Sequence, residues 1–257
     1  EMCIRDSFYT VDDFKPFDSK SRTWTLKDGV VNSSPLSGDP RPGNAKFKKL
    51  TPVDENSANP YTLTDDDRTV IGNTTPKFSG GFGLNATFKG FDVSAFFNFM
   101  YDFDVFNANK VMMTTWASNN YNNFSMDISA AKRWRNFDDM GNEIRYSPEI
   151  LAEFNKNATM WNPTSIGRPI AMSYAVEDGS FLRLNTATIG YTLPRAWTNK
   201  VGLSRVRFYA SGYNLFTITG YSGYDPEVDI ATGLTPNIDN NRYPRSRTYT
   251  FGVQLTF

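Results

Sequence analysis

Hydrophobic and polar residues alternate strictly at the end of the chain. From Thr248 onward, every second side chain is apolar or aromatic, and these positions are Tyr249, Phe251, Val253, Leu255 and Phe257. Successive side chains of a strand point to opposite faces. The pattern therefore predicts a strand at 247–257 with one apolar face and one polar face.

Two further alternating runs lie upstream, at 78–88 and 91–101. Only Lys89 and Gly90 separate them, and a two-residue connection that contains glycine is typical of a tight β-hairpin. These residues therefore predict two antiparallel strands that are neighbours in a sheet.

A third pair of strands is predicted at 181–192 and 205–216. The apolar positions of the first strand change parity, from Leu182 and Leu184 to Ala187 and Ile189. Such a slip indicates a β-bulge or a local change of register. The turn between the strands, 193–204, contains Pro194 and Gly202, which end regular structure.

Long polar segments separate these strands, at 8–76, 102–180 and 217–246, and two short helices are predicted near 128–134 and 148–157. Long irregular connections are unusual in a compact domain but common on the outer face of a membrane barrel. All the long connections fall at one end of the predicted strands. The sequence thus predicts an all-β, antiparallel transmembrane β-barrel with long extracellular loops and a periplasmic C-terminus.

Composition agrees with a strand-built membrane protein. The 257 residues include 21 Phe, 13 Tyr and 5 Trp, and barrels place aromatic side chains in lipid-facing bands and girdles. Lys+Arg and Asp+Glu both number 27, so there is no basic surplus for binding nucleic acid. No apolar run reaches the roughly 18 residues that a spanning helix requires.

The chain offers little catalytic chemistry. It contains no His and one Cys, so a Cys/His metal site, an internal disulfide and a Ser-His nucleophile are all excluded. Glu143, Glu149 and Glu153 have no spacing that suggests an acid/base pair. We expect neither enzymatic activity nor a cofactor.

The first seven residues, Glu1-Met-Cys-Ile-Arg-Asp-Ser7, look like a translated sequencing adapter. We interpret residues 1–7 as a processing scar, which makes 8–257 the protein segment proper. The alternative is a genuine N-terminal strand.

Several sequence blocks together identify a family resemblance. In chain order they are Asp65-Asp-Asp-Arg-Thr-Val-Ile-Gly-Asn73 with Pro76-Lys-Phe78, Phe88-Lys-Gly-Phe-Asp-Val93, Val176-Glu-Asp-Gly-Ser-Phe-Leu-Arg-Leu184, Ile189-Gly-Tyr-Thr-Leu-Pro194, Asn214-Leu-Phe216, Tyr221-Ser-Gly-Tyr-Asp-Pro-Glu-Val228, Tyr243-Pro244 and Phe251-Gly252 through Phe257. Over residues 35–257 the chain resembles the SusC/RagA family of TonB-linked outer-membrane transporters.

The resemblance implies the C-terminal strands of a barrel of roughly 22 strands, whose plug and N-terminal strands are missing here. It implies a nutrient importer in the cell outer membrane, surrounded by lipid. The implied partners are a SusD-like lipoprotein, TonB through the missing N-terminal region, and the barrel-assembly machinery. The implied cargo is an oligosaccharide or another polymer fragment, such as a peptide.

One block departs from the family pattern. An Asn-Gly-Asp-Gly stretch often precedes the Asp-Asp-Arg block in the family, whereas residues 52–60 here lack glycine. Because a calcium loop requires a glycine turn, we assign no calcium to Asp65, Asp66 or Asp67. We expect these three residues to form a solvated loop that leads into the first strand.

Three groups of residues are candidates for function. The terminal aromatic strand, Tyr249 to Phe257, is a candidate assembly signal. Four aromatic residues of segment 102–180 are candidates for contact with cargo or a partner lid, with packing inside the loop as the favoured alternative; they are Trp116, Tyr121, Trp134 and Trp161. Arg183 and Arg207 fall on the polar face of their strands, where they would line a wet interior.

Two other classes of protein remain open at this stage. A soluble carbohydrate-binding β-sandwich would bury the apolar strand faces against a second sheet. A passive porin or an adhesin would share the barrel but would lack an energy-coupling segment.

Overall fold

The computed structural model describes residues 5–116, 123–166, 170–228 and 236–257 of the chain. The chain divides into two compact units. Unit 1 comprises Glu1–Gly72 and Asn107–Val176, and unit 2 comprises Asn73–Phe106 and Glu177–Phe257. Each unit is described by itself.

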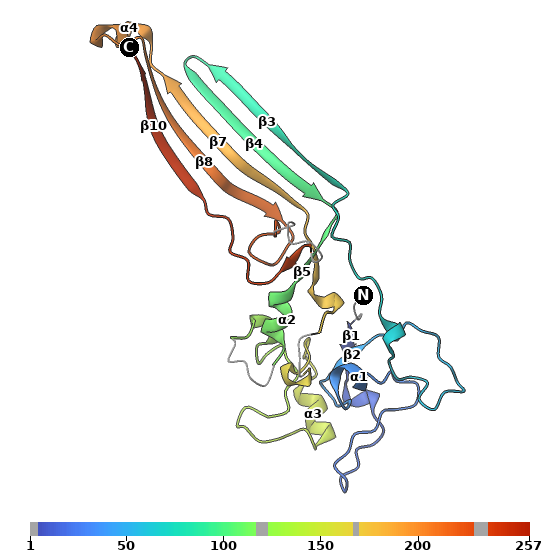
Figure 1. Ribbon diagram of the computed structural model, residues 1–257. Helices are drawn as coiled ribbons and strands as arrows, with labels where there is room; N and C mark the ends of the chain where they lie inside the picture. Colours follow the sequence, from blue (N-terminus) through green and yellow to red (C-terminus); the bar gives the residue numbers. More distant parts are fainter. Residues whose placement is uncertain (1–4, 117–122, 167–169, 229–235) are drawn as a thin grey trace. The chain divides into compact units, whose positions relative to one another are not determined.

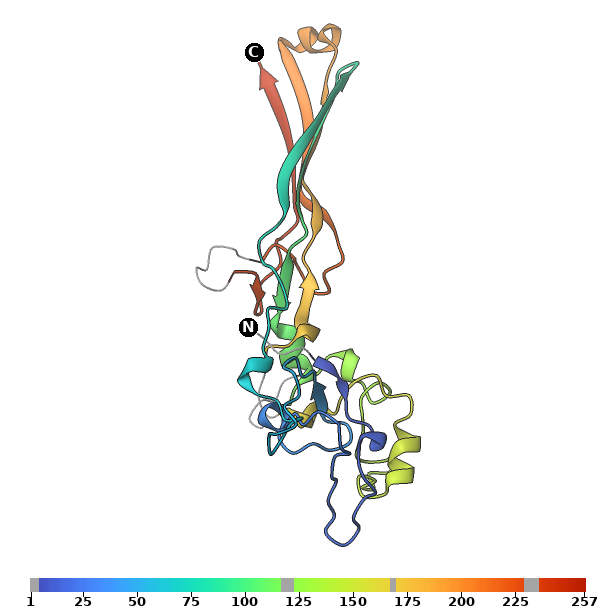
Figure 2. The same ribbon diagram turned by 90° about the vertical axis from the view of Figure 1, so that its right-hand side faces the viewer.

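Unit 2 is built on one antiparallel sheet of five strands in the order β10-β8-β7-β4-β3 (Figure 1). Each of these strands pairs with the long strand that comes before or after it in the chain. The short strands that lie between them in the sequence belong to a different sheet. Seen from the side, the strands form a single curved layer (Figure 2). The strands are β3 (Phe78–Phe88), β4 (Phe91–Tyr101), β7 (Phe181–Thr192), β8 (Arg205–Thr219) and β10 (Thr248–Thr256).

The observed bounds follow the alternation of the sequence closely. β3, β4 and β7 begin and end where alternation predicts, while β8 continues three residues beyond the predicted end, to Thr219. The β3–β4 hairpin turns through Lys89 and Gly90, whose φ angles are 46° and 88°. Positive φ at both central residues is the geometry that tight hairpins require.

The parity slip predicted in the strand at 181–192 is a bulge. Register shifts between Phe96 and Phe97 where β4 pairs with β7, so Asn185 is an extra residue of β7 relative to β4. The pairing of β7 with β8 shifts at the same level, where Asn185 lies opposite two residues of β8, Asn214 and Leu215. Apolar side chains therefore stay on one face of the sheet although their parity along β7 changes.

Smaller elements lie in unit 2, two of which include one residue each of unit 1, Asn107 and Val176. A second sheet has the order β6-β5-β9, formed by Val176–Asp178, Asp104–Asn107 and Ile238–Asp239. The connection between β7 and β8 contains α4 (Arg195–Thr198) and the 3₁₀ helix η6 (Asn199–Val201).

Unit 1 joins the long segments that precede β3 and follow β5. A small sheet pairs β1 (Arg5–Phe8) with β2 (Ala45–Phe47). The helices are α1 (Ser34–Ser37), α2 (Ala108–Thr114), α3 (Pro148–Phe154) and five 3₁₀ turns: η1 (Val11–Asp13), η2 (Asp65–Asp67), η3 (Met126–Ile128), η4 (Pro163–Ser165) and η5 (Ser173–Ala175). The first four residues of the predicted adapter segment lie outside the described part of the chain. Its origin stays a prediction.

The helix predicted near 128–134 is wrong. Only the turn η3 forms there, and it ends at Ile128. The backbone N–H of Trp134 donates to the carbonyl of Met160 at 2.8 Å, so this stretch pairs with a distant segment instead of coiling on itself. The second predicted helix does form, as α3.

A hydrophobic cluster holds unit 1 together. Trp134, Ile144 and Leu151 are buried, and Phe8, Trp24 and other apolar side chains pack against them. These residues come from segments with no helical or strand periodicity, which explains why alternation and helical spacing do not reveal this core.

Replacement of Gly43 by Ala is expected to destabilise unit 1 by about 2–3 kcal/mol. Gly43 has φ +88°, and an added methyl group would lie 2.1 Å from Cδ1 of the buried Trp134. Urea unfolding followed by tryptophan fluorescence measures the change. Gly29→Ala is the control, because Gly29 also has positive φ but nothing within 4 Å. Equal losses for the two variants would mean that packing against Trp134 contributes nothing.

Candidate functional site

Residues of unit 2 form alternating apolar and polar rows across the sheet. One apolar row contains, from one edge of the sheet to the other, Phe251, Ala210, Ile189, Val93 and Ala86. Its large members are open to the surroundings, with Phe251 79% exposed. A soluble domain would bury such a face. In this structure it is uncovered along the sheet.

The neighbouring row is polar or small throughout, and it contains Gly252, Tyr209, Gly190, Asp92 and Thr87. The next polar row includes Thr188 and Ser211, whose hydroxyl oxygens lie 2.8 Å apart. The five strands thus present one apolar and one polar surface.

An ion pair crosses the polar surface above Gly190. The guanidinium of Arg207 on β8 pairs with the carboxylate of Asp92 on β4, and Arg207 Nε lies 2.9 Å from Asp92 Oδ1. Strand β7 lies between them. A methyl group at Gly190 would lie 2.5 Å from Arg207 Nη2 and 2.6 Å from both Asp92 oxygens. The absence of a side chain at Gly190 therefore lets the pair span three strands.

A second charged group, the Arg183 cluster, joins β7 to the segment that follows β8. It consists of Arg183, Asp225, Glu227 and Arg245. The Arg183 side chain donates to Asp225 Oδ1 at 2.5 Å and lies 3.7 Å from Glu227 Oε2. Arg245 donates to the other oxygen of Glu227 at 2.7 Å. Arg183 is only 1% exposed, so this pairing is shielded from water.

Further contacts hold the segment that follows β8 in place. The Ser222 backbone N–H and hydroxyl each donate to the Glu177 carboxylate at 2.8 Å. Tyr221 packs in a buried cluster with Phe103, Val105 and other side chains, and its hydroxyl donates to Asp239 Oδ2 at 2.7 Å. Burial, followed by the hydrogen bond to Asp239, raises the pKa of the Tyr221 hydroxyl, which therefore stays protonated and acts as a donor.

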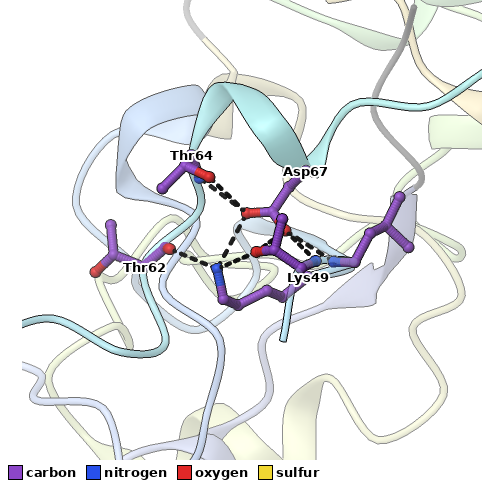
Figure 3. A network of polar contacts seen from close by, with 6 residues as sticks. Lys49, Thr62, Thr64 and Asp67 are labelled. Atoms are coloured by element: carbon purple, nitrogen blue, oxygen red, sulfur yellow. Dashed lines mark hydrogen bonds and ion pairs between the residues drawn. The ribbon is translucent and has the colours of Figure 1, made fainter. Parts of the chain in front are cut away.

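Unit 1 contains a buried carboxylate, Asp67, at the end of η2 (Figure 3). Asp67 Oδ1 accepts hydrogen bonds from the backbone N–H groups of Leu50 and Thr51 at 2.8 and 2.7 Å. Oδ2 accepts from the Thr64 N–H at 2.9 Å and from Lys49 Nζ at 3.2 Å. The carboxylate thus accepts from three backbone N–H groups that belong to two separate stretches of the chain.

This arrangement corrects the expectation that the run of three aspartates is solvated. Asp65 and Asp66 are exposed, but Asp67 is 4% exposed. Burial alone would raise the pKa of the Asp67 carboxyl, yet hydrogen bonds from Thr51 and Thr64 outweigh burial and hold that pKa well below its ordinary value. Asp67 is a structural anion.

The aromatic residues singled out by the sequence have different environments. Trp161 and Trp134 are 0% and 3% exposed. Trp161 packs edge-on against Tyr174, and Trp134 against Phe8. The faces of both indoles are therefore closed to a ligand in this structure, as the packing alternative requires. Trp116 is exposed beside Phe124, and Tyr121 lies outside the described residues.

The residues of the candidate assembly signal lie on an edge strand. β10 pairs with β8 on one side, and Tyr249, Phe251, Val253, Leu255 and Phe257 are all exposed. Their role in assembly stays a prediction.

Sequence reasoning placed Arg183 and Arg207 on the polar face but missed their partners. Asp92 lies in the block that ends at Val93, and Asp225 and Glu227 lie in the block that ends at Val228. Arg183 lies in the block 176–184, so its occurrence with Asp225 and Glu227 in separate blocks of one family pattern was the available signal for that cluster, whereas Arg207 lies in none of the blocks.

The described residues contain no group of three or more His, Cys, Asp or Glu side chains that could hold a metal ion. None of the helices in the described ranges is long and apolar enough to cross a bilayer, a finding that has no bearing on crossing by strands.

Curated proteins that are similar in sequence to this chain are named TonB-dependent receptors. The chain is 32% identical over 228 residues to TonB-dependent receptor P3 of Formosa agariphila, a match that covers 86% of this chain and 20% of that protein. It is 32% identical over 164 residues to TonB-dependent receptor SusC of Bacteroides thetaiotaomicron, covering 58% of this chain and 15% of SusC. The chain thus spans about a fifth or less of the length of these relatives. No protein-family model matches the sequence.

Solved structures share the fold. The RagAB peptide importer in its closed-closed state matches 100% of this chain and 22% of its own, with a TM-score of 0.58 and 22% identity. The open-open state of RagAB matches 84% of this chain and 21% of its own, with a TM-score of 0.57 and 24% identity. At this level of identity the likeness concerns the fold alone.

Proposed function

Because this chain belongs to the SusC/RagA-like TonB-dependent receptors, we propose that it forms the C-terminal barrel strands of an outer-membrane nutrient importer. The observation that carries the proposal is the alternation of apolar and polar rows across five strands. In a barrel wall the apolar rows contact lipid and the polar rows line the lumen. The remaining strands and the plug would come from a longer chain.

We propose that the strands have one orientation in the membrane. The hairpin turn at 89–90 and the connection at 193–204 lie on the periplasmic side, together with Phe257. The segments before β3, between β4 and β7, and after β8 then lie outside the cell. This arrangement places every long connection on one side, which is the usual asymmetry of such barrels.

The proposed cargo is an oligosaccharide or another polymer fragment, taken up with a SusD-like lipoprotein and energy from TonB. The structural neighbour RagAB is described as a peptide importer, so peptides belong in the same test. Deletion of the gene, and separately of tonB, should abolish growth on the cargo as sole nutrient. Undiminished growth of both strains on every glycan and peptide tested would contradict import.

Tryptophan substitutions on β10 are expected to report which face meets lipid. In the full-length receptor reconstituted with brominated lipids, the fluorescence of Trp introduced by Val253→Trp should be quenched, because Val253 belongs to an apolar row. The signal from Gln254→Trp should not be quenched, because that residue points to the polar face. Each is measured against the unsubstituted receptor in the same lipid. Equal quenching at the two sites would contradict a lipid-facing sheet.

The terminal strand is proposed to double as an assembly signal. Phe257→Ser should lower the amount of receptor inserted in the outer membrane, because the insertion machinery would meet a strand that no longer ends on an aromatic residue. Immunoblots of membrane fractions measure the change. Phe88→Ser is a matched control: Phe88 is an exposed residue at the end of a strand away from the terminus. A comparable drop for both variants would mean that lipid contact alone explains the effect.

A soluble β-sandwich is not favoured, because the apolar face of the sheet is uncovered in this structure.

A further inference from the structure

Unit 1 contains a polar cleft of about 490 Å³, within the size range of small-ligand sites. Four segments that are distant in sequence meet there. The residues that line the cleft include Arg22, Trp24, Arg41, Asp39, Arg145 and Tyr146.

Backbone contacts fix the segments that form the cleft. Arg22 and Trp24 lie between Phe14 and Leu26, which bridge the two arms of their loop. The Arg41 carbonyl accepts from the Asn44 N–H at 2.9 Å, and the neighbouring Gly43 carbonyl accepts from Asn162 at 2.8 Å. The positions of the lining residues are therefore largely set before any ligand arrives.

The cleft is positively charged. Three arginines line it, against the single carboxylate of Asp39. Arg145 is paired with Glu143. In the described part of the chain, neither Arg22 nor Arg41 has a carboxylate within ion-pairing distance. Two guanidinium groups can therefore still bind an anion through paired hydrogen bonds.

Aromatic rings stand beside these arginines. Trp24 is half-buried and is held by Phe14 and Phe17, with ring centroids 5.4 and 4.8 Å away. The Arg22 guanidinium carbon lies 5.3 Å from the centroid of the half-buried Tyr146 ring. A braced, partly open indole offers the flat apolar surface on which the C–H face of a sugar ring can pack.

From this combination we propose that the cleft binds an anionic oligosaccharide. Its carboxylate or sulfate groups pair with Arg22 and Arg41, and a sugar ring packs against Trp24. The inference rests on the proposed importer function only in that an importer would meet such a ligand outside the cell. It adds a preference for acidic over neutral glycans and assigns that preference to unit 1.

The test is isothermal titration of the full-length receptor in detergent with four probes. They are digalacturonate, a sulfated galactobiose, neutral galactobiose and a peptide of acidic residues. We expect both charged disaccharides to bind at least about tenfold more tightly than the neutral one, because each charge-assisted pair contributes about a factor of ten. Affinity for the charged sugars should also fall as salt rises.

Variants locate the site. Arg22→Gln and Arg41→Gln should each weaken binding of digalacturonate by about tenfold. Arg68→Gln removes the same charge from an exposed site of unit 1 outside the cleft and should bind like the unsubstituted receptor. Trp24→Leu should weaken binding of the charged and neutral disaccharides alike.

Three results would overturn the proposal: equal affinity for galactobiose and digalacturonate, unchanged affinity in both cleft variants, or binding of the acidic peptide alone. A growth assay separates this failure from failure of the importer. If growth on some cargo depends on the receptor and on TonB, any of these results overturns the assignment of the binding site to the cleft but leaves the import function intact. If the receptor binds digalacturonate selectively but growth on no cargo requires the receptor, only the import function is contradicted.

Discussion

Arg183→Leu is expected to lower the free energy of unfolding by about 3–5 kcal/mol, since it removes one partner of a buried ion pair. The Asp225 carboxylate would keep the hydrogen bond from the Glu227 N–H at 2.9 Å but lose its cation. Glu227 would keep only Arg245. The segment after β8 should therefore detach from β7 more often, while the five-stranded sheet itself persists.

Two measurements check this expectation in the full-length receptor. Urea unfolding gives the stability, and limited proteolysis reports whether bonds between Gly220 and Tyr243 become accessible. Arg205→Leu is the control, since Arg205 is an exposed arginine of β8. A double variant, Arg183→Leu with Asp225→Leu, should lose less than the sum of the two single changes, because no unpaired charge is left between them. Additive losses and unchanged proteolysis would show that the Arg183 cluster does not hold the segment.

Asp67→Ala is expected to destabilise unit 1 by about 3–5 kcal/mol at neutral pH. The substitution removes the acceptor for Leu50, Thr51 and Thr64 and leaves the Lys49 ammonium, whose side chain is 9% exposed, without its carboxylate. Lys49 would retain contacts with the Thr51 hydroxyl and the Thr62 carbonyl, but both are uncharged. Urea unfolding by tryptophan fluorescence gives the size of the loss.

The stabilisation that Asp67 provides should decrease as the pH falls and should not decrease as the pH rises. Its folded pKa lies below the unfolded value of about 3.9, so its stabilisation is complete above that value and decreases as pH falls below it. The difference in the free energy of unfolding between the unsubstituted protein and Asp67→Ala should therefore be constant from pH 7 to about 5 and should become smaller in stronger acid. Asp65→Ala, at an exposed neighbour, should show no comparable loss. A difference that widens in acid would contradict the assigned role.

The strands could be predicted from the sequence because their signal is local. Each strand alternates within about ten residues, and the glycine of the 89–90 turn marks its own geometry. The bulge in β7 was visible as a change of parity for the same reason. These features require no knowledge of what lies across the sheet.

The charged contacts could not be predicted in the same way. Arg183 and Asp225 are 42 positions apart, and nothing within either segment specifies the other. Asp67 was misjudged because a run of three acidic residues is usually solvated, whereas its environment depends on Lys49 and Thr51 from an earlier loop. The core of unit 1 escaped notice because Trp134 and Leu151 belong to no periodic pattern.

The extra residue Asn185 determines which side chains of β7 lie on the apolar face of the sheet and which lie on the polar face. On one side of this extra residue the even-numbered positions Leu182 and Leu184 are apolar, and on the other side the odd-numbered Ala187 and Ile189 are. Deletion of Asn185 would make the strand alternate strictly from Leu182 to Ile189, with Arg183 still on the polar surface. Deletion of one residue elsewhere in β7, with Asn185 kept, would instead turn the part of the strand beyond it to the opposite face. Among single-residue deletions in β7, the one at Asn185 should therefore disturb the two surfaces least.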